Sequence, residues 1–147
     1  MNSNGIQWVR PPKSLVAGIE HYGMRVMVGV VAVANYVGMK MQNEARQKAS
    51  WEDRTGAARS GLFYAVDTPG LWQIIGELGP KAVEALAAKT DTVVVQGEPN
   101  AINLYLGHTV FYGRYLESSN GGKNAIILST MRANLSVLET QLKRMLR

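Results

Sequence analysis

The stretch SLVAGIEHYGMRVMVGVVAVANYVGMKMQNEARQKA, residues 14–49, decides the fold of this chain. Apolar side chains recur along it at spacings of three and four, which is typical of one stripe on an amphipathic helix. The stripe consists of Leu15, Ile19, Tyr22, Val26, Val30, Val33, Val37 and Met41. Ser14 is a suitable N-cap, and Arg46 and Lys48 suit the negative C-terminal end of a helix dipole. The pattern predicts one helix over residues 14–49.

This helix is long for a chain of 147 residues. At 1.5 Å per residue it would extend about 54 Å, whereas a domain of this size has a radius of gyration of about 15 Å. Two outcomes are open. Either Gly23, Gly29 or Gly38 breaks the helix, or the helix projects and packs on another subunit, since valines and glycines lower its propensity and packing must hold it.

The most apolar part of the helix, residues 26–34, imitates a membrane-spanning or export segment. Asn35 interrupts this run, Arg25 and Lys40 flank it, and it falls short of the ~18 residues that a spanning helix needs. The stretch before it is long and carries Glu20, unlike the short basic start of a secretory signal. We therefore expect a buried helix in a soluble protein, with no membrane as a partner.

The composition of the chain excludes several classes of site and indicates its domain organisation. We expect one domain, residues 14–147, preceded by an extended arm, residues 1–13, in which Trp8 is the only large apolar anchor. The chain has no cysteine, which excludes disulfides, thiolate metal sites and a cysteine nucleophile. Its two histidines are too few for a typical multi-histidine site, so we expect no metal and no cofactor. The net charge of +5 permits contact with DNA phosphates but is mild for a dedicated nucleic-acid binder.

The rest of the chain predicts short strands and helices. Residues 60–67 alternate as a strand and end at a turn signal, and residues 71–79 are ambiguous. Apolar runs on either side of residues 97–100 predict a hairpin from residues 92–96 and 101–106. Further expectations are helices over residues 80–89 and 110–117, a loop over 118–123, a short extended piece over 125–128 and a final helix from about Met131. The expected class is α+β, with a long N-terminal helix, a small, mostly antiparallel sheet and a C-terminal amphipathic helix.

No motif in the chain predicts catalysis. The tripeptide at residues 121–123 is Gly-Gly-Lys, but a Walker loop needs a glycine where Glu117 stands and a Ser or Thr where Asn124 stands. His108 lies near two serines, yet the chain lacks the G-x-S-x-G elbow of a serine hydrolase. We therefore expect that the protein is not an enzyme.

Two segments stand out instead. The first, WEDRTGAAR, spans residues 51–59 directly after the long helix, and the second, YGRYLE, spans residues 112–117. Each has an ordinary interpretation, the first as a helix exit with Trp51 on the core, the second as a short aromatic helix that covers the sheet. These segments and the arm supply the structural or interface candidates: Trp8, Trp51, Asp53, Arg54, Thr55, Gly56, Arg59, Tyr112, Gly113, Tyr115 and Glu117.

In this order, the two segments resemble a known family, the small neck or tail-completion proteins of long-tailed bacteriophages. Members have a long N-terminal helix with a basic end, a Trp-x-Asp-Arg-Thr-Gly segment with a nearby arginine, and a His-x-x-x-Tyr-Gly-x-Tyr-Leu-Glu segment before a final helix. The matching residues are Trp51, Asp53, Arg54, Thr55, Gly56 and Arg59, then His108, Tyr112, Gly113, Tyr115, Leu116 and Glu117. The resemblance covers residues 14–147. One departure is the stretch of residues 68–100, which is longer than in a minimal member.

The resemblance implies a virion structural protein that forms a ring, usually of six subunits, around the DNA channel between head and tail. Its partners would be further copies of itself, the head-completion stopper, the tail terminator or tail tube protein, and the genomic DNA in the lumen. It would be assembled in the host cytoplasm and reside in the neck of the virion. Two alternatives stay open, a tail terminator ring that caps the tail tube and a basic nucleic-acid-binding module.

Arg54 is expected to have a structural role within this family pattern. A guanidinium beside a turn can bond several carbonyls, or one carboxylate, through its fixed fork. Glu117 and Asp53 are the candidate carboxylates. The rival hypothesis places Arg54 in the channel, in contact with DNA.

Overall fold

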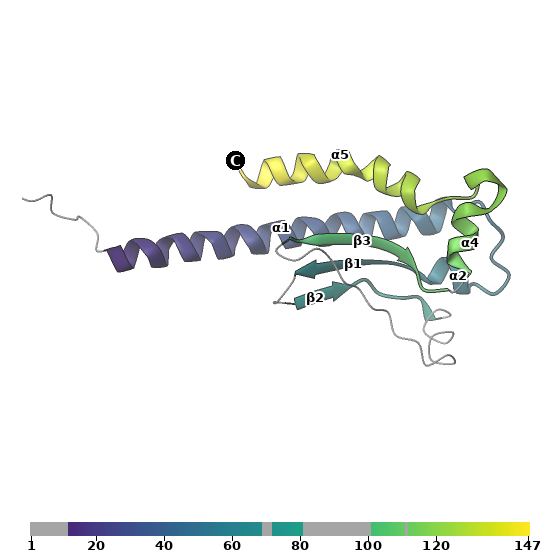
Figure 1. Cartoon of the computed structure of the whole chain (residues 1–147), viewed down its shortest axis with the longest axis horizontal. Coiled ribbons are helices and arrows are strands. Elements are labelled where there is room, and N and C mark those ends of the chain that lie inside the picture. Colours follow the sequence, from purple (N-terminus) through teal and green to yellow (C-terminus); the bar gives the residue numbers. More distant parts are fainter. Residues whose placement is uncertain (1–11, 69–71, 81–100, 111) are drawn as a thin grey trace, which may run out of the picture.

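A computed structural model of the chain describes residues 12–68, 72–80, 101–110 and 112–147. The elements are α1 (Pro12–Lys48), α2 (Ala57–Ser60), β1 (Leu62–Thr68), β2 (Trp72–Ile75), β3 (Asn103–His108), α4 (Gly113–Ser118), the 3-10 helix η1 (Ser119–Gly122) and α5 (Ile127–Met145). Figure 1 shows α1 between the small sheet and α5, which runs back along it. The expected α+β class, with its long first helix, antiparallel sheet and C-terminal helix, is confirmed.

Helix α1 is continuous from Pro12 to Lys48, so its glycines do not break it. It begins two residues earlier than expected, and Ser14 is therefore not its N-cap. A proline is well tolerated in the first turn, where its missing N–H would have no helical partner. The last turn carries Arg46 and Lys48 as expected.

The described part of the sheet has three strands in the order β2-β1-β3, and both pairings are antiparallel. Leu62, Tyr64 and Val66 of β1 belong to the core that α1 covers. A Cβ on Gly38 would lie 2.2 Å from the Tyr64 ring, so the glycine lets helix and sheet approach closely. The Tyr64 hydroxyl donates to Asn35 Oδ1 at 2.5 Å, and burial raises the pKa of this tyrosine.

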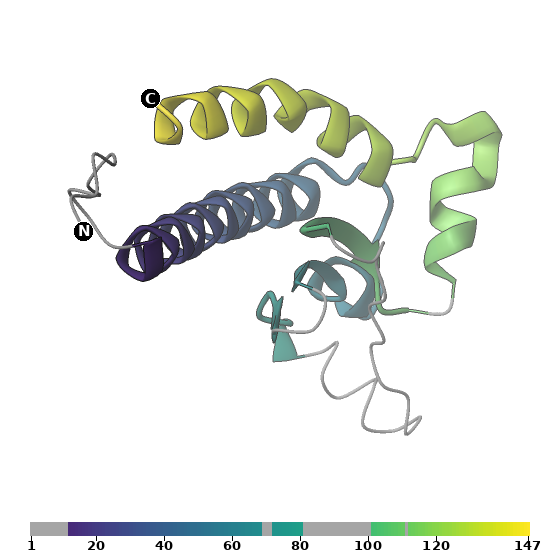
Figure 2. The ribbon, with the colours of Figure 1, turned by 60° about the vertical axis from the view of Figure 1, so that its left-hand side comes forward.

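Only the C-terminal part of α1 is covered in this way. Residues 13–25 are all exposed, and within residues 26–34 only Val31 and Ala34 are buried. The expected burial of the apolar run is thus wrong for most of its length, because the sheet and α5 cover only the later turns of α1 (Figure 2). By length and composition alone α1 could cross a membrane, a test that soluble core helices and signal sequences also pass.

Several smaller expectations are corrected or lie outside the described residues. Residues 125–128 are not an extended piece, because α5 already begins at Ile127, and the expected loop over 118–123 contains η1. The run 101–106 contributes to β3, which pairs with β1, whereas residues 92–96 lie outside the described residues. The same holds for residues 1–11 of the arm, with Trp8, and for nearly all of the helix expected over residues 80–89.

Candidate functional site: a clamp at the end of the long helix

The first of the two segments caps both the helix before it and the helix after it. The Asp53 carboxylate accepts hydrogen bonds from the backbone N–H of Ala58 at 3.4 Å and of Arg59 at 2.8 Å, at the start of α2. Gly56 has φ 74°, a left-handed conformation that favours glycine. The segment therefore turns the chain sharply from α1 toward β1.

Arg59 is the residue that ties this turn back to α1. Its guanidinium donates to the carbonyl oxygens of Arg46 at 2.7 Å, Ala49 at 2.7 Å and Trp51 at 3.1 Å. These carbonyls lie at or just beyond the C-terminal end of α1, where helical partners run out and the dipole favours a cation. The guanidinium also lies over the buried Trp51 ring, 5.2 Å from its centroid, a distance suited to a cation–π contact.

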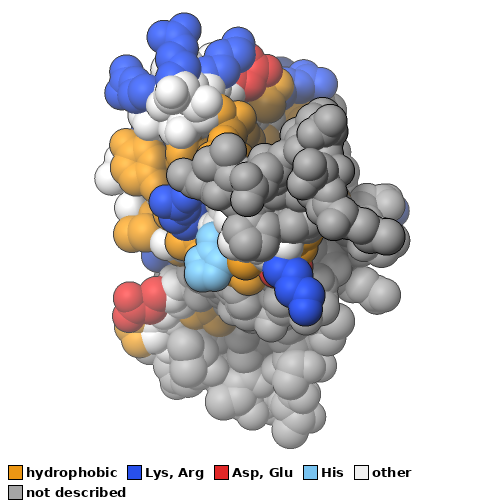
Figure 3. Space-filling view, turned by 90° about the vertical axis from the view of Figure 1, so that its left-hand side faces the viewer, with side chains coloured by type: hydrophobic (Ala, Val, Ile, Leu, Met, Phe, Trp, Pro, Cys, Tyr) orange, Lys and Arg blue, Asp and Glu red, His pale blue; other side chains and the backbone are white. Residues whose placement is uncertain are grey.

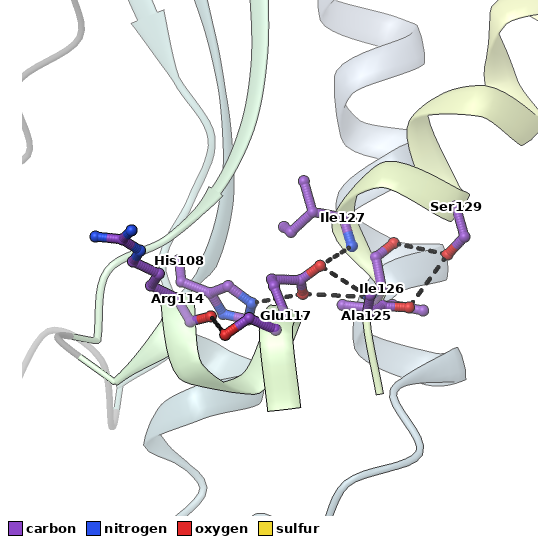
Figure 4. A network of polar contacts seen from close by, with 8 residues as sticks. His108, Arg114, Glu117, Ala125, Ile126, Ile127 and Ser129 are labelled. Carbon is purple, nitrogen blue, oxygen red and sulfur yellow. Dashed lines mark hydrogen bonds and ion pairs between the residues drawn. The ribbon is translucent and has the colours of Figure 1, made fainter. Parts of the chain in front are cut away.

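The second segment holds the N-terminus of α5 through Glu117. One of its carboxylate oxygens accepts from Ile126 N and Ile127 N at 3.1 Å each, and the other from Ile126 N at 3.2 Å (Figure 4). A carboxylate at this position satisfies free N–H groups and suits the positive end of the dipole. Because Glu117 lies near the end of α4, it fixes α4 and α5 relative to each other.

His108 connects the two segments. Its Nε2–H donates to Glu117 Oε1 at 3.1 Å, and its ring centroid lies 6.1 Å from that of Trp51. A Cβ on Gly113 would lie 2.4 Å from His108 Cβ, so only glycine lets α4 start this close to β3. We call this arrangement the clamp. It consists of Trp51, Asp53, Arg59, His108, Gly113 and Glu117.

Two polar residues of α1 extend the clamp to the sheet: Gln42, which no pattern in the sequence pointed to, and Arg46, which was expected only to suit the helix dipole. Arg46 donates to the carbonyls of Arg59, Ser60, Leu62 and Glu77 at 2.9–3.2 Å. Gln42 donates to the carbonyls of Leu62 and Glu77, both at 2.9 Å. Burial of the Arg46 guanidinium lowers its pKa. In the sequence both residues look like ordinary solvent-facing positions of a helix.

A second polar group holds α5 against α1. Lys40 bonds Glu44 and donates to Asn134 Oδ1 at 2.7 Å. Asn134, buried on α5, donates in turn to Glu44 Oε2 at 2.8 Å and to the Thr130 carbonyl at 2.9 Å. The hydrogen bond from Lys40, followed by that from Asn134, lowers the pKa of Glu44.

The structure places the candidate residues, other than Trp8, in three settings. The clamp contains Trp51, Asp53, Arg59, Gly113 and Glu117, and Gly56 makes its turn. Tyr112 packs against the core. Arg54, Thr55 and Tyr115 are exposed. The Thr55 hydroxyl accepts from the N–H of Ala57, at the start of α2, at 3.3 Å.

The expected contact between Arg54 and Glu117 is wrong. Arg54 is exposed, and Glu117 is held by His108 and by backbone amides of α5. The neighbouring Arg59 makes the several carbonyl contacts that we expected of Arg54. The alternative contact, between Arg54 and Asp53, is also wrong. The Asp53 carboxylate accepts from backbone N–H groups of α2 instead.

The chemistry of the clamp is that of a scaffold. Its carboxylates are engaged by backbone N–H groups, and the His108 Nε2–H is engaged by Glu117. Within the described residues there is no group of three His, Asp or Glu side chains that could hold a metal ion. The chain matches no protein-family model, and no curated protein or solved structure is significantly similar to it.

Proposed function

We propose that this chain is a structural subunit of the neck of a long-tailed bacteriophage. Copies of it form a ring, with six subunits as the resemblance implies, around the DNA channel at the head–tail junction. The ring joins the head-completion stopper to the tail tube, and the protein performs no catalysis.

The observation that carries this proposal is the projecting half of α1. Five large apolar side chains in residues 13–25 are exposed: Leu15, Val16, Ile19, Tyr22 and Met24. This is more apolar surface than a domain that acts alone would leave uncovered. A ring subunit, by contrast, needs apolar surface for its neighbours.

The clamp supports the same proposal. Six of the residues that carry the resemblance form the clamp, which fixes α1, the sheet, α4 and α5 relative to each other. A subunit under load between head and tail needs such a rigid body, and the carboxylates of Asp53 and Glu117 and the guanidinium of Arg59 hold it through hydrogen bonds.

A phage that lacks the protein tests this function. We expect its lysates to contain DNA-filled heads and separate, complete tails in electron micrographs, and purified protein should join them. Intact virions in the absence of the protein would refute the proposal, and so would a failure to make heads or tails at all.

The tail terminator alternative predicts a different defect. Without a terminator, tail tubes have no defined end, so tails of irregular length would accumulate instead of complete ones. Tail length in the same micrographs therefore separates the two. The purified protein should be monomeric or weakly associated, because a preformed ring would compete with ordered assembly.

A further inference from the structure

Helix α5 packs on α1 through a seam of residues that alternate in spacing between four and three, which is typical of one face of a helix. Two contacts show how the helices are aligned: Met145 lies against Gly29, and Asn134 accepts from Lys40. Met145 and Asn134 are 11 residues apart on α5, as are Gly29 and Lys40 on α1, so both contacts belong to one antiparallel register. The seam consists of Ile127, Met131, Asn134, Leu138, Gln141 and Met145, all buried or half-buried.

The apolar stripe that this seam meets on α1 continues past the end of α5. Beyond Gly29 it runs on through Val26, Tyr22 and Ile19 into the projecting half. Figure 3 views the molecule from the end where α1 begins and α5 ends, and hydrophobic side chains lie at the surface there. The stripe is therefore long enough to receive α5 in more than one position.

A shift of α5 by one heptad toward the start of α1 would return the same seam to the same stripe. The shift is about 10 Å along the helix axis and would bring Met145 from Gly29 to Tyr22. Tyr22 and Val26 would join the contact at one end, and Glu44 would leave it at the other. The shifted contact is at least as apolar as the observed one, so the apolar pattern by itself does not fix the register.

Asn134 is the residue of the seam whose partners exist in one register alone. Its side chain is 1% exposed. Its Oδ1 accepts from Lys40 Nζ at 2.7 Å, and its Nδ2 donates to Glu44 Oε2 at 2.8 Å and to the Thr130 carbonyl at 2.9 Å. The bond to Thr130 lies within α5 and would survive a shift. The two bonds to α1 would be lost.

We propose that Asn134 fixes the register of α5 on α1 and thereby keeps the projecting half of α1 from being covered by the last helix of its own chain. One heptad earlier on α1, its carboxamide would meet Val33 and Val37, and a buried amide that loses its partners is costly. Fixing the register of paired helices is the best-attested role of a single buried asparagine in an apolar seam.

The cap by Glu117 does not replace this role. Glu117 holds the first amides of α5, and a shift would break these bonds too. The cap, however, is insensitive to which residues of α1 the seam meets. The connection through residues 118–126 could span about 30 Å when extended, so it is long enough to follow the shift. Asn134 acts in the middle of the seam, where the two registers differ.

Three introduced cysteines can report the register, because the chain has none of its own. The full-length variant carries Tyr22→Cys, Gly29→Cys and Met145→Cys. The thiol at position 145 pairs with position 29 in the observed register and with position 22 in the shifted one. Positions 22 and 29 lie about 10 Å apart along α1, too far to form a disulfide with each other. The protein is oxidised at low micromolar concentration, and peptide mass spectrometry gives the ratio of the shifted to the observed disulfide.

With Asn134 in place, we expect almost only the observed disulfide, and Asn134→Leu should raise the ratio several-fold. Asn134→Ala removes the same bonds with a smaller side chain and should raise it too. The matched control is Ser136→Leu, which adds a leucine at an exposed position of α5 and should leave the ratio unchanged. Asn134→Leu/Ile127→Asn moves the asparagine by one heptad, so that it meets Lys40 and Glu44 only after the shift. This variant should give mainly the shifted disulfide.

An unchanged ratio in the Asn134 variants would overturn the inference, and so would an equal rise in Ser136→Leu. Thermal melts separate register from stability. If Asn134 were only a stabilising contact, Asn134→Leu would lower the melting temperature and leave the ratio as it was. The inference does not depend on the proposed function. A register that stays fixed without Asn134 would remove only the role of this residue, whereas a shift in a protein that is dispensable for joining would remove only the neck function.

Discussion

The two halves of α1 share a helix but not an environment. In the later half, apolar residues such as Val37 and Met41 are buried by the sheet and α5, and polar residues such as Gln42 and Arg46 bond carbonyls of the sheet and its connections. In the first half, residues 13–25 are exposed regardless of their type. An apolar stripe therefore predicts a helix, but the neighbouring elements decide which of its turns are buried.

The two halves of α1 also differ in the contacts available to stabilise them. The later half is fixed by contacts within the chain, so substitutions there should change the stability of the monomer. The first half has its apolar surface free for contacts between chains. Substitutions there should change association and leave the folded monomer nearly unaffected.

The largest expected effect is that of Arg59→Ala. It removes three hydrogen bonds to carbonyls at the end of α1 and the contact with Trp51, so we expect a loss of about 3 kcal/mol in the free energy of unfolding. Arg59→Lys should recover only a part of this. The exposed neighbour Arg54 provides the control, and Arg54→Ala should stay within about 0.5 kcal/mol. Urea unfolding curves that coincide for the two alanine variants would refute the role assigned to Arg59.

A pair of glycine substitutions compares the halves directly. Gly38→Ala should cost about 2 kcal/mol, because its methyl group meets the Tyr64 ring. Gly18→Ala meets nothing within 4 Å and should stabilise the monomer by up to about 1 kcal/mol through helix propensity. Thermal melts of the two variants should shift in opposite directions. A shift in the same direction would contradict the difference between the halves.

Glu117→Gln tests whether Glu117 caps the N-terminus of α5. The amide keeps one acceptor oxygen for the N–H groups of Ile126 and Ile127, but it turns an NH2 group toward His108 and has no charge. We therefore expect a loss of about 1 kcal/mol. Hydrogen exchange should become faster at the amides of Ile126 and Ile127, which Glu117 protects. Glu139→Gln, at an exposed position of α5, is the control. Unchanged exchange at both amides would show that Glu117 does not cap α5.

The smallest effect is a pH dependence at Glu44. Its pKa is lowered from the usual 4.5 by hydrogen bonds from Lys40 and Asn134, so its contribution to stability is present above pH 4.5 and is lost as the pH falls through the lowered pKa. At neutral pH the free energy of unfolding of the wild type should be larger than that of Glu44→Gln by less than about 1 kcal/mol. This difference should shrink in acid. A difference that grows in acid would have the wrong sign for this contact.

The elements whose signals are local could be predicted from the sequence. The long helix, its basic end, the strand after it and the amphipathic last helix all follow from the spacing of apolar residues within one element. The two segments around Trp51 and Tyr112 were also singled out, through their resemblance to a family pattern. The spacing signals of the helices and the strand need only neighbours in the sequence.

The partners of these residues depend on how the elements pack together. Arg54 and Arg59 are equally plausible in the sequence, but the left-handed turn at Gly56 sends Arg59 back to α1 and leaves Arg54 in solvent. Glu117 reaches the first amides of α5 only because α4 is seated on His108. Such contacts depend on the relative placement of elements, which the spacing of residues within one element does not encode. The same reason explains why the stripe on α1 predicted a helix but not which half of it lies in the core.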